Sequence, residues 1–123
     1  MVVAAKNKPP REQVAGQWVS NIAGQNGATA SNSVLIPMVA GDQLEIPWSV
    51  SSEASYDWLT ITINSPQGSG LQVVRQSGTN NGTYVFTCTA GGNVSVIMQY
   101  SKDGSVHVGS DRGIVGPITR INK

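Results

Sequence analysis

The chain has 123 residues, a length that fits one domain whose core needs no disulfide bonds. Its residues are 39% hydrophobic but only 12% charged, which excludes an intrinsically disordered chain and a helical bundle with charged outer faces. The formal net charge of +1 excludes a strongly basic nucleic-acid-binding surface. We therefore expect no nucleic-acid partner.

Residues 1–14 form a polar segment that we expect to be an extended arm. Pro9-Pro10 forbids a helix there and favours an extended path. Three bases against one acid give the arm a charge of +2, whereas the other 109 residues hold five bases and six acids. We expect a folded domain over 15–123, held to a partner by the arm. The alternative is that the arm folds back across its own domain and covers an open edge strand. The expected partner-binding residues of the arm are Val2, Val3, Lys6, Lys8, Pro9, Pro10 and Arg11.

From residue 15 onward the chain has the pattern of short strands separated by turns, with no helical period. Pro37 places its strand at a sheet edge or at a bulge, because proline has no N–H to donate. Asn81-Gly82 is typical of a hairpin turn, residues 25–33 predict a loop, and Gly116-Pro117 bends the last strand. The predicted strands are 16–22, 34–40, 43–50, 57–64, 71–76, 83–89, 93–101 and 112–121.

Alternation of apolar and polar residues assigns side chains to the interior of the predicted fold. Cys88 shares its parity with Tyr84 and Phe86, so we expect a buried, unreactive thiol. About eight strands with turns roughly every 8–12 residues predict an all-β fold, an antiparallel jelly-roll β-sandwich. The expected core consists of Leu44, Ile46, Trp48, Leu59, Ile61, Ile63, Phe86, Val94, Val96 and Met98.

The sequence shows no sign of export or of membrane insertion. The apolar start of MVVAAKNKPP is too short for the h-region of a signal peptide, and its basic residues follow that start instead of preceding it. No apolar run approaches the roughly 18 residues of a membrane-spanning helix. We therefore expect a cytoplasmic product with no membrane partner.

Two phrases place acids, aromatics and small hydroxyl residues at strand ends: SSEASYDWL at 51–59 and YSKDGSVHVGSD at 100–111. They resemble the phrases SSE-x-x-YD-x-L and YSKD-x-S-x-x-x-GSD of jelly-roll β-sandwich modules found in bacterial surface and secreted proteins. Those modules are similar to lectin-like and carbohydrate-binding domains. The resemblance covers 48–118, supports the sandwich prediction and implies a glycan as one candidate ligand.

One segment departs from these modules. Where they have an aromatic residue followed by Ile-Asp-Asn, this chain has Ile114-Val115-Gly116-Pro117, so an acid and an amide are absent. Calcium binds roughly six to eight oxygens, and the remaining candidate acids are scattered along the sequence. We therefore expect no cofactor and no metal ion. The acids that a calcium ion would use are Glu53, Asp57, Asp103 and Asp111.

The candidate ligand-binding residues lie in the same two phrases. Asp57 could contact a ligand, but capping of backbone N–H groups at a turn is the interpretation that we favour. Asp103-Gly104 has the composition of a turn, and Asp111 could form a local ion pair. Trp58 is opposite in parity to the apolar residues of its strand, so it is exposed or covered by an N-terminal segment or a neighbouring subunit. The candidates are Tyr56, Asp57, Trp58, Asp103 and Asp111.

Catalysis is not expected. His107 is the only histidine, so neither a His-based triad with a second histidine nor a zinc site with three histidines can form. No pair of carboxylates is placed by the sequence as in a glycosidase. We expect that the protein is not an enzyme.

Two functions from different classes remain. A small jelly roll with an extended arm and no export signal resembles the decoration (cement) proteins of bacteriophage heads, and jelly rolls are common among viral shell proteins. This resemblance implies a structural protein of the virion exterior, assembled in the host cytoplasm. Its partners would be the major capsid protein and neighbouring copies of itself, as a homotrimer. The alternative is a lectin-like, carbohydrate-binding module for a glycan ligand or a host receptor.

Overall fold

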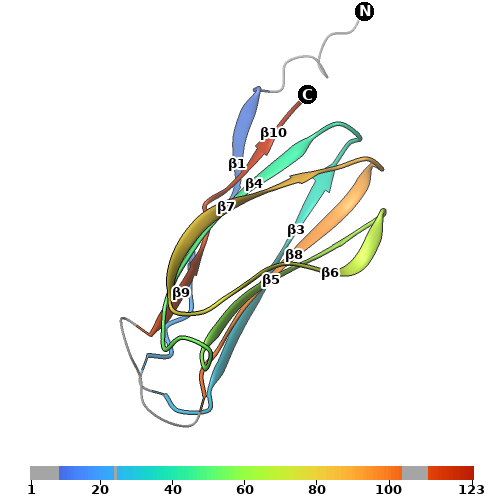
Figure 1. Ribbon diagram of the computed structural model, residues 1–123. Helices are drawn as coiled ribbons and strands as arrows, with labels where there is room; N and C mark the ends of the chain where they lie inside the picture. Colours follow the sequence, from blue (N-terminus) through green and yellow to red (C-terminus); the bar gives the residue numbers. More distant parts are fainter. Residues whose placement is uncertain (1–8, 24, 104–110) are drawn as a thin grey trace, which may run out of the picture.

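The computed structural model describes residues 9–23, 25–103 and 111–123, and it shows two antiparallel β-sheets packed face to face (Figure 1). The described part of the chain contains no helix long and apolar enough to cross a bilayer. The strands are β1 (Arg11–Ala15), β2 (Trp18–Val19), β3 (Thr29–Met38), β4 (Gln43–Ser51), β5 (Trp58–Ser65), β6 (Gly68–Gln76), β7 (Thr79–Thr87), β8 (Gly92–Ser101), β9 (Arg112–Val115) and β10 (Ile118–Ile121).

The order of the strands is that of a jelly roll. In one sheet β1 pairs with β10 and β2 with β9, both β10 and β9 pair with β4, and β4 also pairs with β7. The other sheet has the order β3–β8–β5–β6. When β1 with β2 and β9 with β10 are each taken as one interrupted strand, every connection except the β5–β6 hairpin crosses between the sheets. The predicted jelly-roll sandwich is confirmed.

The interior between the sheets contains the side chains that alternation predicted. Nine of the ten expected core residues are at most 3% exposed, and Trp48 is half-buried against the same cluster. Cys88 is 1% exposed, which confirms the buried thiol. The core also contains Ile36, Met38, Val50, Val74, Tyr100, Val115 and Ile118.

Gly116-Pro117 bends the last strand, as predicted, and separates β9 from β10. Gly116 has a φ of 96°, and its N–H donates to the carbonyl oxygen of Pro47 at 2.8 Å. In an extended strand the N–H and C=O of one residue point to the same side. A residue other than proline at position 47 would therefore also direct its N–H toward the interruption between β9 and β10. β10 pairs with residues 43–45 of β4 and β9 with residues 48–51, which leaves Pro47 opposite the interruption.

The hairpin predicted at Asn81-Gly82 is wrong. Both residues lie inside β7, and the chain turns at Ser77-Gly78, where Gly78 has a φ of 74°. This turn joins two different sheets, so it is not a hairpin. Gly82 lies opposite Trp48, and a Cβ there would come within 2.9 Å of the indole ring. The glycine therefore serves close packing of a tryptophan.

Several strands differ in length from their predictions; β6 and β7, for example, begin at Gly68 and Thr79 instead of at residues 71 and 83. The predicted loop 25–33 is wrong in its second half, because β3 begins at Thr29 and stays paired with β8 as far as Ser101. The predicted strand 16–22 shortens to the two residues of β2. β3 lies at the edge of its sheet, as Pro37 predicted.

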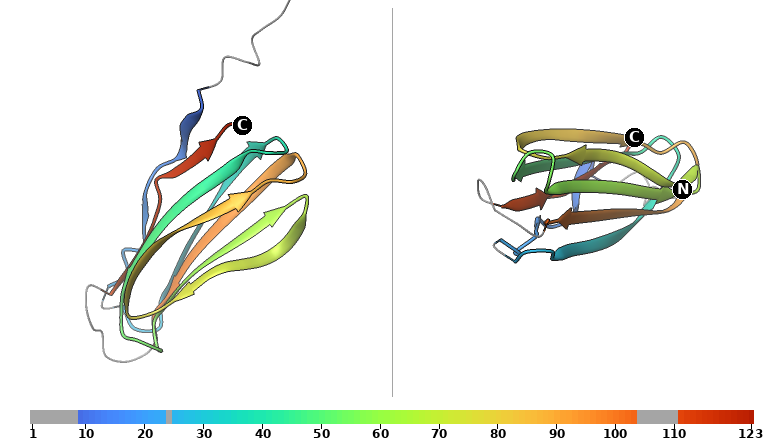
Figure 2. Two further views of the ribbon diagram at one scale, coloured as in Figure 1. Left: turned by 45° about the horizontal axis from the view of Figure 1, so that its top comes forward. Right: turned by 60° about the horizontal axis from the view of Figure 1, so that its bottom comes forward.

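The last part of the predicted arm is a strand of the sandwich. β1 pairs with β10, and the carbonyl oxygens of Pro9 and Pro10 accept hydrogen bonds from the side chain and backbone N–H of Asn122 at 2.6 and 2.9 Å. Residues 9–15 thus cover the edge that β10 would otherwise present to solvent. The arm residues Val2, Val3, Lys6 and Lys8 lie outside the described residues. The left view of Figure 2 shows β1, in dark blue, beside the C-terminal strand, in red.

Candidate functional site

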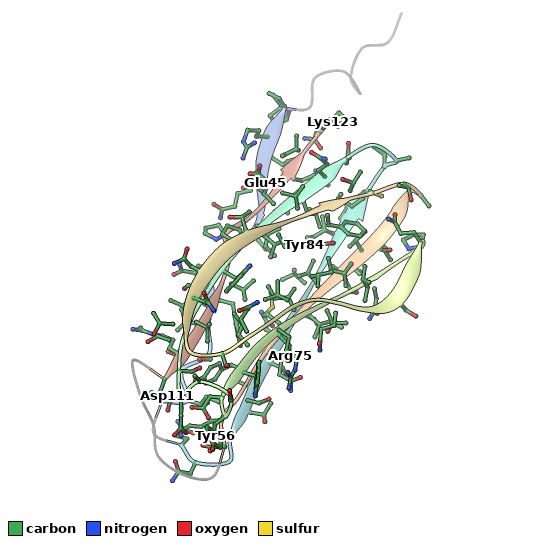
Figure 3. All side chains as sticks on the ribbon, viewed as in Figure 1. Glu45, Tyr56, Arg75, Tyr84, Asp111 and Lys123 are labelled. Atoms are coloured by element: carbon green, nitrogen blue, oxygen red, sulfur yellow. The ribbon has the colours of Figure 1, made fainter. Side chains whose placement is uncertain are left out.

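The two quoted phrases meet at the end of the sandwich farthest from the C-terminus. The β4–β5 loop, residues 52–57, lies beside the residues that leave β8 and enter β9. Figure 3 shows Tyr56 and Asp111 at this end, with Glu45 and Lys123 toward the opposite end. We call this region the loop end.

Local hydrogen bonds shape the β4–β5 loop. The backbone N–H groups of Tyr56 and Asp57 both donate to the carbonyl oxygen of Glu53, at 3.2 and 3.1 Å. The hydroxyl of Ser52 donates to the carbonyl oxygen of Asp57 at 2.9 Å. Within this compact loop the side chain of Asp57 is fully buried, whereas Tyr56 is 60% exposed.

Three of the four candidate acids converge inside this loop end. One carboxylate oxygen from each of Glu53, Asp57 and Asp103 lies within 4.8 Å of the other two. Oδ1 of Asp57 accepts the backbone N–H of Asp103 at 2.9 Å. Asp57 therefore accepts a backbone N–H group, but this group belongs to a residue after β8 and not to the turn that contains Asp57. Acids that are scattered in the sequence are neighbours in the fold.

Two oxygens of these acids are buried without a hydrogen-bond partner in the described structure: Oδ2 of Asp57 and Oε1 of Glu53. A buried polar atom that has lost water and gained no partner is destabilising by roughly 1–3 kcal/mol, and by more when it is charged. In this cluster, Oδ2 of Asp57 and Oε1 of Glu53 are therefore acceptors without a donor among the described residues.

The fourth acid, Asp111, has different surroundings. It is 1% exposed, and its Oδ1 accepts the hydroxyl of Tyr100 at 2.7 Å. Lys102, whose side chain is fully buried, places Nζ 3.6 Å from Oδ2 of Asp111 and 3.9 Å from Oδ1 of Asp103. Burial, followed by the hydrogen bond and the charge of Asp111, raises the pKa of Tyr100 far above its ordinary value. The phenol therefore stays protonated and remains a donor.

The chain matches no family model and no curated protein. The lectin-like resemblance in its sequence is therefore supported at the level of the β-sandwich alone.

The two aromatic candidates at the loop end differ in access. Trp58 is half-buried, and the guanidinium carbon of Arg75 lies 3.8 Å from the centre of its ring, a cation–π contact. One ring face is thus covered by a side chain of the same chain. Tyr56 is the aromatic side chain that the loop end presents to solvent.

Sequence reasoning missed an open groove over β4, of about 350 Å³. Trp48, which was assigned to the core, forms part of its wall and is half-buried. The signal that could have found it is Gly82, whose missing side chain leaves room beside the indole. The groove is also lined by Gln17, Ser49, Asn81, Thr83 and Ile114.

Proposed function

We propose that the chain is a decoration (cement) protein of a bacteriophage head, which binds the major capsid protein and neighbouring copies of itself. The observation that carries the proposal is a pair of sheet edges without charged residues. β3 and β7 contain no charged residue, and they expose Leu35 and Val85, whose exposed fractions are 63% and 45%. Edge strands of monomeric proteins are usually blunted by charges, bulges or a covering segment.

The other two edges of the sandwich are protected in these ways. β6 carries Arg75 and is joined to β5 with two register irregularities, and β1 carries Arg11 and Glu12. Among the described edges, β3 and β7 therefore lack charged residues, although β3 contains Pro37. Uncharged edges on opposite sheets suit a protein that packs between neighbours, as in a homotrimer on a shell.

The arm has the complementary role in this proposal. Because residues 9–15 bind their own sandwich, we assign capsid binding to residues 1–8 and not to Pro9, Pro10 or Arg11. Lys6 and Lys8 would meet an acidic shell surface in salt-sensitive contacts, and Val2 and Val3 supply an apolar tip. The mature protein would lie on the virion exterior after assembly in the host cytoplasm.

Deletion of residues 2–8 tests the arm without removing β1. We expect the truncated protein to unfold at the same temperature as the intact one but to lose co-sedimentation with phage heads that lack the protein. A double Lys6→Gln and Lys8→Gln variant should bind more weakly, with a smaller dependence on salt. Binding of the truncated protein as tight as that of the intact one would overturn the assignment of the arm.

Substitution at the edges tests contacts between copies. We expect Leu35→Lys combined with Val85→Lys to convert an oligomer to a monomer in sedimentation velocity experiments. Leu71→Lys is the matched control, because Leu71 is 50% exposed on the protected strand β6. A strictly monomeric intact protein that also fails to bind heads would contradict the decoration proposal.

The groove beside Trp48 supports a second candidate, a carbohydrate-binding module. Its volume lies in the range of small-molecule sites, and an aromatic ring next to amide and hydroxyl side chains can stack on a sugar and bond its hydroxyls. Binding of the intact protein to a glycan array, with loss of binding in Asn81→Ala and retention after deletion of residues 2–8, would favour this candidate.

A further inference from the structure

We propose that Glu53, Asp57 and Asp103 form a calcium site at the loop end. The site is independent of the decoration proposal, since it uses neither the arm nor the edge strands. It also reverses our expectation from the sequence that no metal ion is bound.

The spacing of the oxygens fits one calcium ion. Ca²⁺ binds oxygens at about 2.3–2.6 Å, so a single ion can hold two oxygens up to roughly 5 Å apart. The three carboxylate oxygens lie within 4.8 Å of one another. Mg²⁺ binds at about 2.0–2.1 Å in a strict octahedron, and it would require a tighter arrangement.

Burial of Asp57 is the independent observation that points to a ligand. This side chain is 0% exposed, and Oδ1 is fixed by the N–H of Asp103, a member of the same cluster. The carboxylate is therefore oriented toward the cluster, while Oδ2 and the neighbouring Oε1 of Glu53 have no hydrogen-bond partner in the described structure. A buried ionised carboxylate is strongly unfavourable unless a cation or donors compensate it. A bound cation would satisfy both oxygens at once.

Among the described residues of the loop end, acids outnumber buried bases. The described residues of this end include four acids and one buried base, Lys102. The acids are Glu53, Asp57, Asp103 and Asp111. Lys102 lies near Asp103 and Asp111. A divalent cation bound by the first three acids would offset most of the remaining negative charge.

Three carboxylates alone do not fill the coordination sphere of calcium, which takes about six to eight oxygens. Calcium requires further oxygens, and water and backbone carbonyls are its usual additional ligands.

Calorimetric titration of the chelator-treated full chain with CaCl₂ tests the site. We expect one bound ion with a Kd between roughly 10⁻⁶ and 10⁻³ M, and an affinity for MgCl₂ at least tenfold weaker. The midpoint of thermal unfolding should rise with calcium concentration, because the ion binds the folded state alone. No heat of binding together with no calcium-dependent midpoint would overturn the proposal, and equal affinity for both ions would overturn its assignment to calcium.

Asp57→Asn gives the sharper test, because two effects of opposite sign are expected. Without calcium the variant should unfold at a higher temperature than the intact protein, since a buried, uncompensated charge is removed while Asn Oδ1 still accepts the N–H of Asp103. With calcium its midpoint should not move. Glu53→Gln should weaken calcium binding at least tenfold while leaving Asp57 in place.

Asp42→Asn is the matched control. Asp42 is also buried, 1% exposed, but its carboxylate accepts the N–H groups of Lys123 and Val39 at 3.1 and 3.4 Å. This variant should unfold at a lower temperature than the intact protein and should keep full calcium binding. Calcium binding retained by Asp57→Asn, or lost equally in Asp42→Asn, would overturn the assigned ligands.

Discussion

Tyr100 is the residue at which the apolar core and the polar loop end meet. Its side chain is fully buried in the core cluster, and its hydroxyl donates to Asp111. The backbone of β9 approaches so closely that a Cβ on Gly113 would lie 3.1 Å from the ring of Tyr100 and 2.9 Å from Leu59. The polar groups of the loop end are therefore held in place by packing that belongs to the core.

Tyr100→Phe should lower the free energy of unfolding by about 1.5–3 kcal/mol, the usual contribution of a hydrogen bond to a charged group. The ring keeps its packing, but Oδ1 of Asp111 loses its donor. Tyr56→Phe is the control, because Tyr56 is 60% exposed and its change should have almost no effect. Denaturant titration measures both values, and equal losses in the two variants would contradict the buried hydrogen bond.

The same residue predicts a dependence on alkaline pH. The pKa of Tyr100 is raised above its ordinary value of 10.0 by burial and by Asp111. A raised pKa in the folded state contributes stability below the unfolded pKa, and this contribution is lost as the pH rises above it. We expect the intact protein to lose stability above about pH 10 more steeply than Tyr100→Phe. Parallel curves for the two proteins would show that the phenol does not titrate as the structure indicates.

At the scale of elements, Arg120 joins three strands near the C-terminus. It lies in β10, its Nη1 donates to the carbonyl oxygen of Pro37 in β3 at 2.6 Å, and its Nη2 forms an ion pair with Glu12 in β1. Its side chain is 11% exposed, whereas that of Arg11, which pairs with Glu45, is 56% exposed. Since β3 belongs to the opposite sheet, one guanidinium links both layers of the sandwich.

We expect Arg120→Met to lower the free energy of unfolding by roughly 2–4 kcal/mol, because the carbonyl oxygen of Pro37 loses its side-chain donor and Glu12, which still accepts from Asn122, loses a largely buried ion pair. Arg11→Met should cost at most about 1 kcal/mol, since exposed ion pairs contribute little. Chemical unfolding of the two variants in parallel makes the comparison. Similar losses of unfolding free energy in both variants would show that burial of the Arg120 ion pair does not increase its contribution to stability.

Strands with clear alternation could be predicted from the sequence, and strands without it could not. β4, β5 and β8 have a buried face that repeats every second residue, so their positions and core residues were predicted. β1 buries none of its side chains fully, and the first half of β3 exposes most of its side chains, so neither segment has a buried face that alternates clearly. The hairpin prediction at Asn81-Gly82 was wrong because this pair is typical of turns, whereas here Gly82 lies within a strand and leaves space for the indole ring of Trp48.

The sequence indicated which acids lie at strand ends, but it could not indicate which of them lie close together in the fold. Both phrases were recognised as strand ends with acids, yet Asp57 and Asp103 are 46 residues apart and belong to different loops. They meet because β5 and β8 are neighbours, with Trp58 paired to Ser101, and this pairing has no local signature. A sequence pattern indicates which residues are polar, whereas the sheet order decides which of them touch.

At the scale of the whole molecule the sandwich has two unlike ends. One end carries β1, β10 and the C-terminus, and the other carries the acid cluster and the exposed Tyr56 (Figures 1 and 3). In the proposed decoration protein the first end would face the shell and the second would face outward. The uncharged edges β3 and β7 run between the two ends, where neighbouring copies would pack.

The hydrogen bonds from Asn122 to Pro9 and Pro10 keep the two described ends of the chain side by side. Replacing residues 1–8 with a short linker that joins the C-terminus to Pro9 would give a circular chain with the same folded contacts. The circle restricts the unfolded chain far more than the folded one, so it should raise the free energy of unfolding by up to about 4 kcal/mol. A denaturant midpoint no higher than that of the linear chain would mean that closure strains the sandwich. The stabilisation would come entirely from lost entropy in the unfolded state.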